Sequence, residues 1–132
     1  MGNIQQIKGE TQMSMKGEIS HFISATRYTM AGIKVALKET AFRQEIFLGV
    51  IHYVGIYFVN AAFSVKLILA VLWPLIMSAE LINSSIEQVV NHISPEWNEF
   101  AKYAKDMCSA AVGILIFTTI CTWCAVLIRV LF

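Results

Sequence analysis

Residues 67–92 read LILAVLWPLIMSAELINSSIEQVVNH and carry only two full charges, on Glu80 and Glu87. A bilayer core of about 30 Å is crossed by about 20 apolar residues in a helix, so this stretch is long enough to span a membrane. A carboxylate inside such a span costs ~2.5–3.5 kcal/mol on insertion scales, and most charges kept there have a function. The stretch therefore predicts a membrane helix that takes part in chemistry or transport.

Asn83 and Asn91 extend the two glutamates into one polar stripe. With 3.6 residues per turn, positions 80, 83, 87 and 91 lie within about 80° of each other around the helix. Glu80 is the deepest member, about 10 Å beyond Glu87 at ~1.5 Å per residue. Such residues can also hold helices together, but the pattern favours a functional site.

Two further segments, 46–65 and 107–128, contain no Lys, Arg, Asp or Glu. The whole chain is 57% hydrophobic and 14% charged, against about 25% charged in ordinary globular domains. A soluble fold of this size could not bury so much apolar surface. We therefore expect an all-α membrane protein with transmembrane helices at about 41–60, 66–92 and 102–130. The net charge of +1 excludes a general nucleic-acid binder.

The N-terminal part differs in character from the membrane segments. Residues 1–19 are polar, and we expect a flexible extension. Residues 20–38 mix apolar and basic side chains, which predicts an amphipathic helix on the membrane surface. A plain linker is the alternative, and Gly32 weakens the case for one unbroken helix. Residues 20–132 together form the expected membrane domain.

The basic residues predict the orientation in the membrane. Of the ten Lys and Arg residues, six lie at or before the start of the first crossing, and Lys102 and Lys105 flank the loop 94–101. The positive-inside rule places the N-terminus and this loop in the cytoplasm and the C-terminus outside. Lys102, Lys105, Asp106 and Ser109 share a helix face at the cytoplasmic boundary, where the polar stripe also ends.

This polar layer suits a polyphosphate with a divalent metal. Mg²⁺ is usually held by one or two carboxylates together with phosphate oxygens, and lysine neutralises phosphate. The deeper Glu80 favours general-base work on a hydroxyl held near the interface. Charges at helix ends are common, so Lys105 with Asp106 is a weaker signal. Glu45 could extend to the surface, and we interpret His52 as a packed or hydrogen-bonded residue.

Three motifs resemble those of the bacterial integral-membrane diacylglycerol kinase: ETAFRQE (39–45), ELINSSIEQVV (80–90) and AKDMCSAAV (104–112). They follow in order on the three expected helices, and the resemblance runs from about Tyr28 to the C-terminus. The first motif looks more like this branch of the family than like its sibling, the undecaprenol kinase of Gram-positive bacteria.

The resemblance implies a homotrimer in the bacterial inner membrane, with active sites shared between subunits. It implies direct in-line transfer of phosphate from ATP to diacylglycerol, giving phosphatidic acid, with Mg²⁺ as cofactor. By similarity, Glu80 is the general base with Asn83 beside it, and Glu39 and Glu87 hold the metal. The implied ATP contacts are Tyr28, Glu39, Glu87, Glu96, Trp97, Asn98, Lys105 and Asp106. The implied lipid-substrate residues are His21, Ala41, Phe42, Arg43, Gln44, Glu45, Glu80 and Ser109.

The sequence departs from the family pattern at a few positions. His21 stands where the family often has Arg, Asn91 replaces an Asp, and Trp97-Asn98 replaces an aromatic-His pair. Two other functions stay open beside the lipid kinase that uses diacylglycerol. One is an undecaprenol kinase, and the other is a small oligomeric proton or cation transporter or channel that uses the polar stripe.

Overall fold

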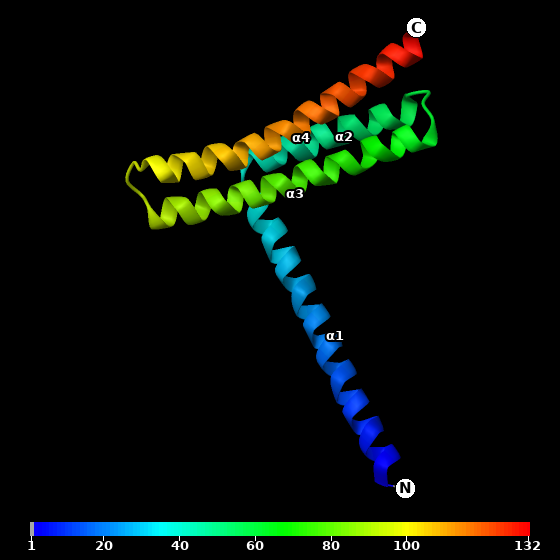
Figure 1. Ribbon diagram of the computed structural model, residues 1–132, viewed down its shortest axis with the longest axis vertical. Coiled ribbons are helices and arrows are strands. Elements are labelled where there is room, and N and C mark those ends of the chain that lie inside the picture. The colour runs from blue at the N-terminus through cyan, green and yellow to red at the C-terminus, as the bar shows by residue number, and fades with distance from the viewer. Residues whose placement is uncertain (1) are drawn as a thin grey trace. The chain divides into compact units, whose positions relative to one another are not determined.

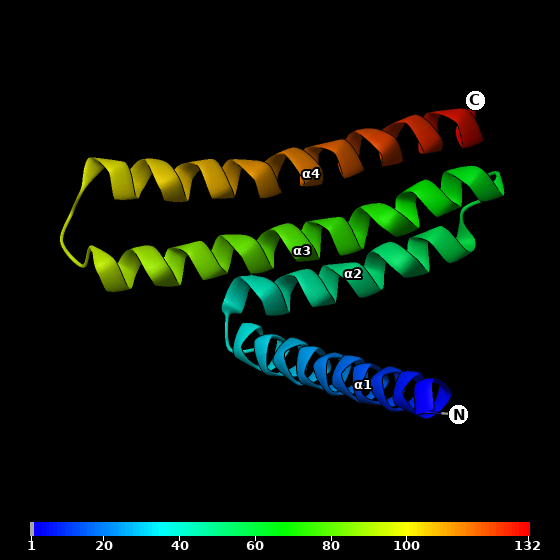
Figure 2. The same ribbon diagram turned by 60° about the horizontal axis from the view of Figure 1, so that its bottom comes forward.

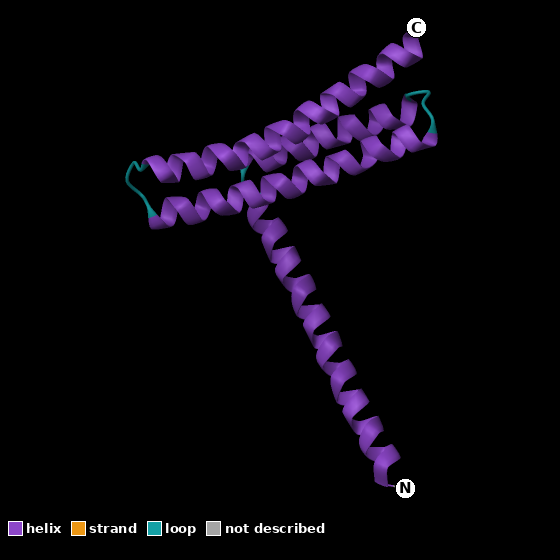
Figure 3. Ribbon diagram, viewed as in Figure 1, coloured by secondary structure: helices purple, strands orange, loops and turns teal. Residues whose placement is uncertain are grey.

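The structure is a computed structural model, which describes residues 2–132 and their side chains from residue 17 onward. All regular secondary structure in these residues is helical (Figure 3). The four helices are α1 (Gly2–Ala36), α2 (Thr40–Phe58), α3 (Phe63–Ile93) and α4 (Glu99–Leu131). The chain divides into two units, Met1–Lys38 and Glu39–Phe132. The prediction of an all-α fold is confirmed.

The first unit is the single helix α1, which covers residues 20–36 of the helix predicted at 20–38. The helix is unbroken at Gly32 and continues back to Gly2, where the sequence predicts a flexible polar extension. Large apolar side chains such as Phe22 and Tyr28 are 72% and 77% exposed. Helix α1 therefore presents apolar groups along its own surface, as a helix lying on a membrane does.

The second unit is an antiparallel bundle of α2, α3 and α4, joined by short loops (Figures 1 and 2). Helix α3 packs against both α2 and α4 and is therefore the central helix. Leu69 and Ile76 on α3 are its most fully buried side chains. They are seven residues apart, so they lie on one face of the helix and form the centre of the core.

Helices α3 and α4 are long and apolar enough to cross a membrane. Only 17% of the most apolar stretch of each helix is buried inside the chain, whereas the core helix of a soluble protein is mostly buried. Helix α2 is shorter, with 19 residues, and has Arg43 and Glu45 in its first two turns. The structure thus provides two candidate membrane spans, and the crossing expected at 41–60 stays a prediction.

The starts of α2 and α4 are capped differently. At α4, Asn98 Oδ1 accepts hydrogen bonds from the backbone N–H groups of Phe100 at 2.9 Å and Ala101 at 3.3 Å. This is a normal N-cap, which satisfies two N–H groups that have no partner within the helix. At α2, Glu39 is the N-cap but its side chain makes no capping bond. The Glu39 carboxylate is therefore left to other partners.

Pro74 lies inside α3 without ending the helix. Proline has no N–H group, so the carbonyl of Ala70 loses its usual donor four residues on. The hydroxyl of Tyr53 on α2 donates to that carbonyl at 3.0 Å. A neighbouring helix thus satisfies the group that proline frees, which is the way membrane bundles tolerate proline.

Candidate active site

Glu80 and Asn83 form the buried centre of the polar stripe on α3. Their side chains are 6% and 8% exposed, and Asn83 Nδ2 donates to Glu80 Oε2 at 3.3 Å. The two residues are three positions apart, so they lie on the same helix face one turn from each other. The bond holds one oxygen of the carboxylate in a defined position.

Glu45 on α2 joins this cluster from the facing helix. Its side chain is 9% exposed, and the next residue, Ile46, lines one groove together with Met77, which lies about one turn before Glu80 on α3. The side chain is therefore buried in the bundle and does not extend to the surface. Sequence reasoning left that alternative open because Glu45 lies near the start of a helix.

The cluster of Glu45, Glu80 and Asn83, called here the acceptor cluster, is short of hydrogen-bond donors. Glu45 Oε2 and Asn83 Oδ1 are both buried and have no hydrogen-bond partner. Most buried polar atoms in proteins are paired, so two orphaned oxygens at one site need an explanation. A ligand that brings an O–H group into the cluster would provide a donor for one of these two oxygens.

Glu39 contacts α3 at Gln88, which lies closer than the acceptor cluster to the loop between α3 and α4. Gln88 Nε2 donates to Glu39 Oε1 at 3.5 Å, a long bond between residues 49 positions apart. Gln88 directly follows Glu87, which is half-buried, so the start of α2 lies beside the turn of α3 that carries Glu87. The sequence did not single out Gln88, because a glutamine on a polar helix face has no motif of its own.

The described residues contain no group of three or more His, Cys, Asp or Glu side chains placed to hold a metal. Two carboxylates near the helix ends, Glu39 and Glu87, remain available. Such a pair fits Mg²⁺ bound with a nucleotide, because this ion usually keeps most of its ligands as phosphate oxygens and water. The donor set therefore fits a metal that arrives with its substrate.

Lys105 on α4 lies at the same depth as Glu87 on α3. Glu87 precedes the end of α3 at Ile93 by six residues, and Lys105 follows the start of α4 at Glu99 by six. At ~1.5 Å per residue, both lie about 9 Å from the loop that joins two packed antiparallel helices. Lys105 is half-buried, whereas Asp106 and Ser109 are exposed.

The loop between α3 and α4 carries Glu96, Trp97 and Asn98, and all three are exposed. Trp97 is 82% exposed and is free to stack on a flat group. Asn98 Oδ1 is occupied by the cap of α4, so only the amide nitrogen of this side chain remains for a ligand. Asn98 thus has a structural task that the sequence did not reveal.

The motif at 39–45 is divided between two faces of α2. Phe42 and Glu45 are buried, whereas Ala41, Arg43 and Gln44 are exposed. An open groove of about 540 Å³ lies along the exposed face and is lined by Thr40, Arg43, Gln44, Phe47 and Leu48. His21 and Tyr28 are exposed on α1, in the other unit. The structure therefore brings Glu80 and Asn83 together and places Glu39 beside the turn that carries Glu87, whereas three of the predicted residues of α2 lie on its exposed face. The predicted residues of α1 are described separately.

Comparison with known proteins gives a consistent result. The family model described as "Prokaryotic diacylglycerol kinase" matches residues 27–127, which include all the polar residues of α2, α3 and α4 discussed above. The chain is similar to the protein named Diacylglycerol kinase in Escherichia coli (strain K12), with 40% identity over 112 residues that cover 82% of this chain and 89% of the relative.

Two further relatives carry the same name. The protein of Haemophilus influenzae is 37% identical over 111 residues, which cover 83% of this chain and 93% of the relative. The protein of Sinorhizobium sp is 37% identical over 98 residues, which cover 74% of this chain and 72% of the relative. The similarity therefore extends over most of each protein compared.

Proposed function

The chain belongs to the prokaryotic diacylglycerol kinase family, and we propose that it transfers the γ-phosphoryl group of ATP to the free hydroxyl of a membrane diacylglycerol. The product is phosphatidic acid. The observation that carries this proposal is the acceptor cluster, in which Glu45 and Asn83 each keep a buried oxygen without a donor. The hydroxyl of a lipid is a donor that can reach this depth without leaving the membrane.

In the proposed reaction, Glu80 is the general base. Asn83 holds one oxygen of its carboxylate, which fixes the direction from which a hydroxyl can approach. The proton of the hydroxyl passes to Glu80, the hydroxyl oxygen bonds to the γ-phosphorus, and the bond from that phosphorus to the leaving ADP oxygen breaks. Positioning provides most of the catalysis, because phosphoryl transfer asks for little covalent work from the protein.

Nucleotide binding is proposed for the cytoplasmic end of the bundle. Glu39 and Glu87 would hold Mg²⁺, which neutralises charge on the phosphate oxygens when it is bound. Gln88 keeps one oxygen of Glu39 occupied and leaves the other for the metal. Lys105, at the depth of Glu87, would contact phosphate as a point charge. The implied contacts of Tyr28, Glu96, Trp97, Asn98 and Asp106 with the nucleotide belong to the same proposal.

The proposed setting is the bacterial inner membrane, with the N-terminus and the nucleotide site in the cytoplasm. The distribution of basic residues supports this orientation. We propose that α2 also crosses the membrane, in addition to α3 and α4, and that α1 lies on the membrane surface. We also propose a homotrimer with shared sites. The apolar exteriors of α3 and α4 leave surface for both lipid and neighbouring subunits.

The test is transfer of labelled phosphate from ATP to diacylglycerol in mixed micelles, with undecaprenol as a second acceptor. Glu80→Gln should lower turnover by at least ~100-fold, because a positioned general base contributes about 10²–10⁴, with ATP affinity retained. Glu99→Gln, an exposed carboxylate outside the cluster, is the matched control and should keep full activity. Absence of transfer to diacylglycerol by the unmodified protein would reject the proposal, and transfer to undecaprenol alone would favour the sibling activity.

A further inference from the structure

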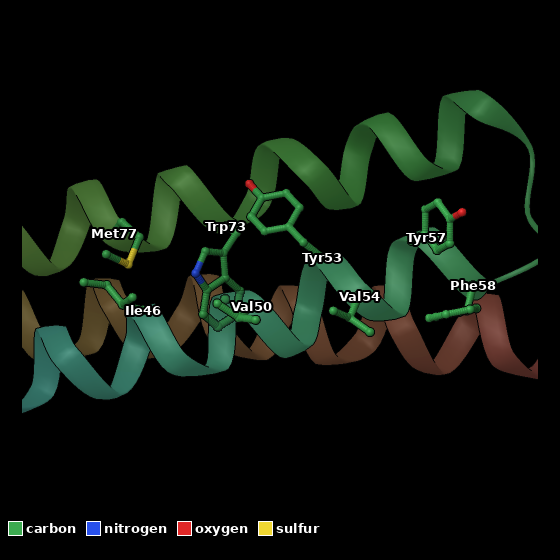
Figure 4. A pocket seen from close by; sticks show the side chains of 9 residues that line it. Ile46, Val50, Tyr53, Val54, Tyr57, Phe58, Trp73 and Met77 are labelled. Carbon is green, nitrogen blue, oxygen red and sulfur yellow. The ribbon is translucent and has the colours of Figure 1, made fainter.

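An apolar groove of about 540 Å³ runs along the bundle between α2 and α3, beyond the acceptor cluster (Figure 4). On α2 its lining extends from Ile46 to Phe58, and on α3 it includes Trp73 and Met77. The lining has no charged side chain. The groove is not part of the polar site described above, and no motif in the sequence pointed to it.

The floor of the groove is built around Trp73. Gly49 leaves the space for its ring, since a Cβ atom at position 49 would overlap Trp73 Nε1. His52 stacks against Trp73 with ring centroids 4.9 Å apart and 31° between the planes. His52 is itself fixed by Leu69 and Trp123 through two hydrogen bonds of 3.0 Å. The indole of Trp73 is therefore held in place before any ligand arrives.

One wall of the groove is fixed in a similar way by Tyr53. Its hydroxyl donates to the Ala70 carbonyl, which lacks an intrahelical donor because of Pro74. Figure 4 shows the Tyr53 ring directed from α2 toward α3, beside Trp73. The ring contact of His52 with Trp73 and the hydrogen bond of Tyr53 thus hold two aromatic rings that line an apolar surface. The groove is preformed and does not arise from loose packing.

The inner end of the groove meets the acceptor cluster. Ile46 directly follows Glu45, and Met77 precedes Glu80 by three residues, which is about one turn. From Ile46 to Phe58 the groove covers 12 residues of helix, or about 18 Å at ~1.5 Å per residue. A leaflet is half of a bilayer core of about 30 Å, so the groove has the length of one hydrocarbon chain.

The shape of the lining favours a flexible chain over another helix. Helices pack in membranes through small residues, which allow their backbones to approach closely. The rim here consists of large side chains, including Val50, Val54, Tyr57 and Phe58. The small residue, Gly49, has its space filled by Trp73. A helix of a second copy of the chain therefore could not pack closely along this groove.

We infer that this groove binds one hydrocarbon chain of the lipid substrate and determines which chain lengths the enzyme prefers. The inference rests on the proposed function, because it places the lipid hydroxyl in the acceptor cluster. The chain then extends from Ile46 toward Tyr57 and Phe58 at the far end. Trp73 and Tyr53 are the residues that determine the width of the groove.

The first test fills the groove about two-thirds of the way along, at a site about 12 Å from Ile46 at ~1.5 Å per residue. Val54→Trp should lower kcat/KM for dioleoylglycerol about tenfold, as expected when roughly two methylene groups lose their apolar contact. Dihexanoylglycerol, whose chains end before this point, should be unaffected. Val71→Trp is the matched control, since Val71 is exposed on α3 and does not line the groove. Equal effects on both substrates, or none on dioleoylglycerol, would overturn the inference.

The second test reads lipid contact without turnover. A diacylglycerol with a diazirine near the methyl end of one chain is photolysed with the unmodified protein, and the labelled residues are mapped by mass spectrometry. Labels should concentrate at 50–58 on α2. If these residues are labelled but no phosphate is transferred, the groove binds lipid and the proposed function is wrong. If phosphate is transferred but the labels are confined to other surfaces, the inference about the groove is wrong.

The size of the oligomer shows whether a lipid or a second copy of the protein occupies the groove. Under the inference, Val54→Trp leaves the elution volume of the purified protein in detergent unchanged. If Val54→Trp instead dissociates the assembly and lowers activity on both substrates, the groove is an interface between copies, and the inference is wrong.

Discussion

Trp123 on α4 donates a hydrogen bond from its indole Nε1 to His52 Nδ1 on α2 at 3.0 Å. Indole nitrogen is only a donor, so His52 Nδ1 accepts and carries no hydrogen. The other ring nitrogen, His52 Nε2, lies 3.0 Å from the Leu69 carbonyl, which is only an acceptor, so Nε2 carries the hydrogen. His52 is therefore a neutral, fully hydrogen-bonded residue that joins three helices, as the sequence interpretation expects.

Removing the donor to His52 should weaken the bundle. Trp123→Phe leaves His52 Nδ1 buried without a partner, which should lower the free energy of unfolding by ~1–3 kcal/mol. Unfolding is followed by far-ultraviolet circular dichroism during transfer from mild detergent to dodecyl sulfate. Trp97→Phe, at an exposed loop position, is the control and should change stability by less than ~0.5 kcal/mol. Equal losses in the two variants would contradict the role given to the bond.

Tyr53 and Pro74 should be energetically coupled. Tyr53→Phe removes the donor to the Ala70 carbonyl, and Pro74→Ala restores a backbone N–H that can replace it. The loss caused by Tyr53→Phe should therefore be smaller in the Pro74→Ala background, by about 0.5–3 kcal/mol in a double-mutant cycle. The same unfolding measurement checks this prediction. Strictly additive effects would show that the hydroxyl does not compensate for proline.

Gln88 should affect the metal requirement more than the chemical step. Gln88→Ala removes the donor that orients Glu39, and loss of such a supporting bond typically weakens metal affinity by about 10–100-fold. Since this bond is long, we expect the lower end of that range in the Mg²⁺ concentration for half-maximal activity, with kcat little changed. Asn60→Ala, in the loop at the other end of the bundle, is the control. A fall in kcat at saturating Mg²⁺ would assign Gln88 a different task.

Asn98 allows its two tasks to be separated. Asn98→Ala removes the N-cap of α4 and should lower the free energy of unfolding by ~1 kcal/mol. Asn98→Ser keeps a capping oxygen and should restore most of that stability. If the amide nitrogen also contacts the nucleotide, both variants should raise the KM for ATP by a similar factor. If both the KM for ATP and the stability recover in Asn98→Ser, the only role of Asn98 is to cap α4.

The sequence was informative where a physical requirement acts on consecutive residues. A long apolar segment can satisfy its backbone groups within itself only as a helix, and a segment of about 20 apolar residues has the length of a membrane helix, so the helical fold followed from composition and length. The three motifs at 39–45, 80–90 and 104–112 identified the family. Helical periodicity likewise placed Glu80 and Asn83 on one face, and their hydrogen bond is the direct result.

The helix bounds followed from the sequence less well. Helix α1 extends to Gly2 and passes Gly32 without a break, because a single glycine in a helix costs only about 1 kcal/mol. Helix α3 likewise begins at Phe63 rather than near residue 66. Local composition shows where polarity changes, but it does not show how far hydrogen bonding between successive turns continues.

The sequence by itself determined the class of the protein, its family and the stripe that carries Glu80 and Glu87. The tertiary structure decided which distant side chains meet: Gln88 with Glu39, and Trp123 with His52. The physical reason is the range of the forces involved. Periodicity and hydropathy act between neighbours along one helix, whereas burial and hydrogen bonds across helices depend on how the helices are rotated and packed, which no single segment encodes.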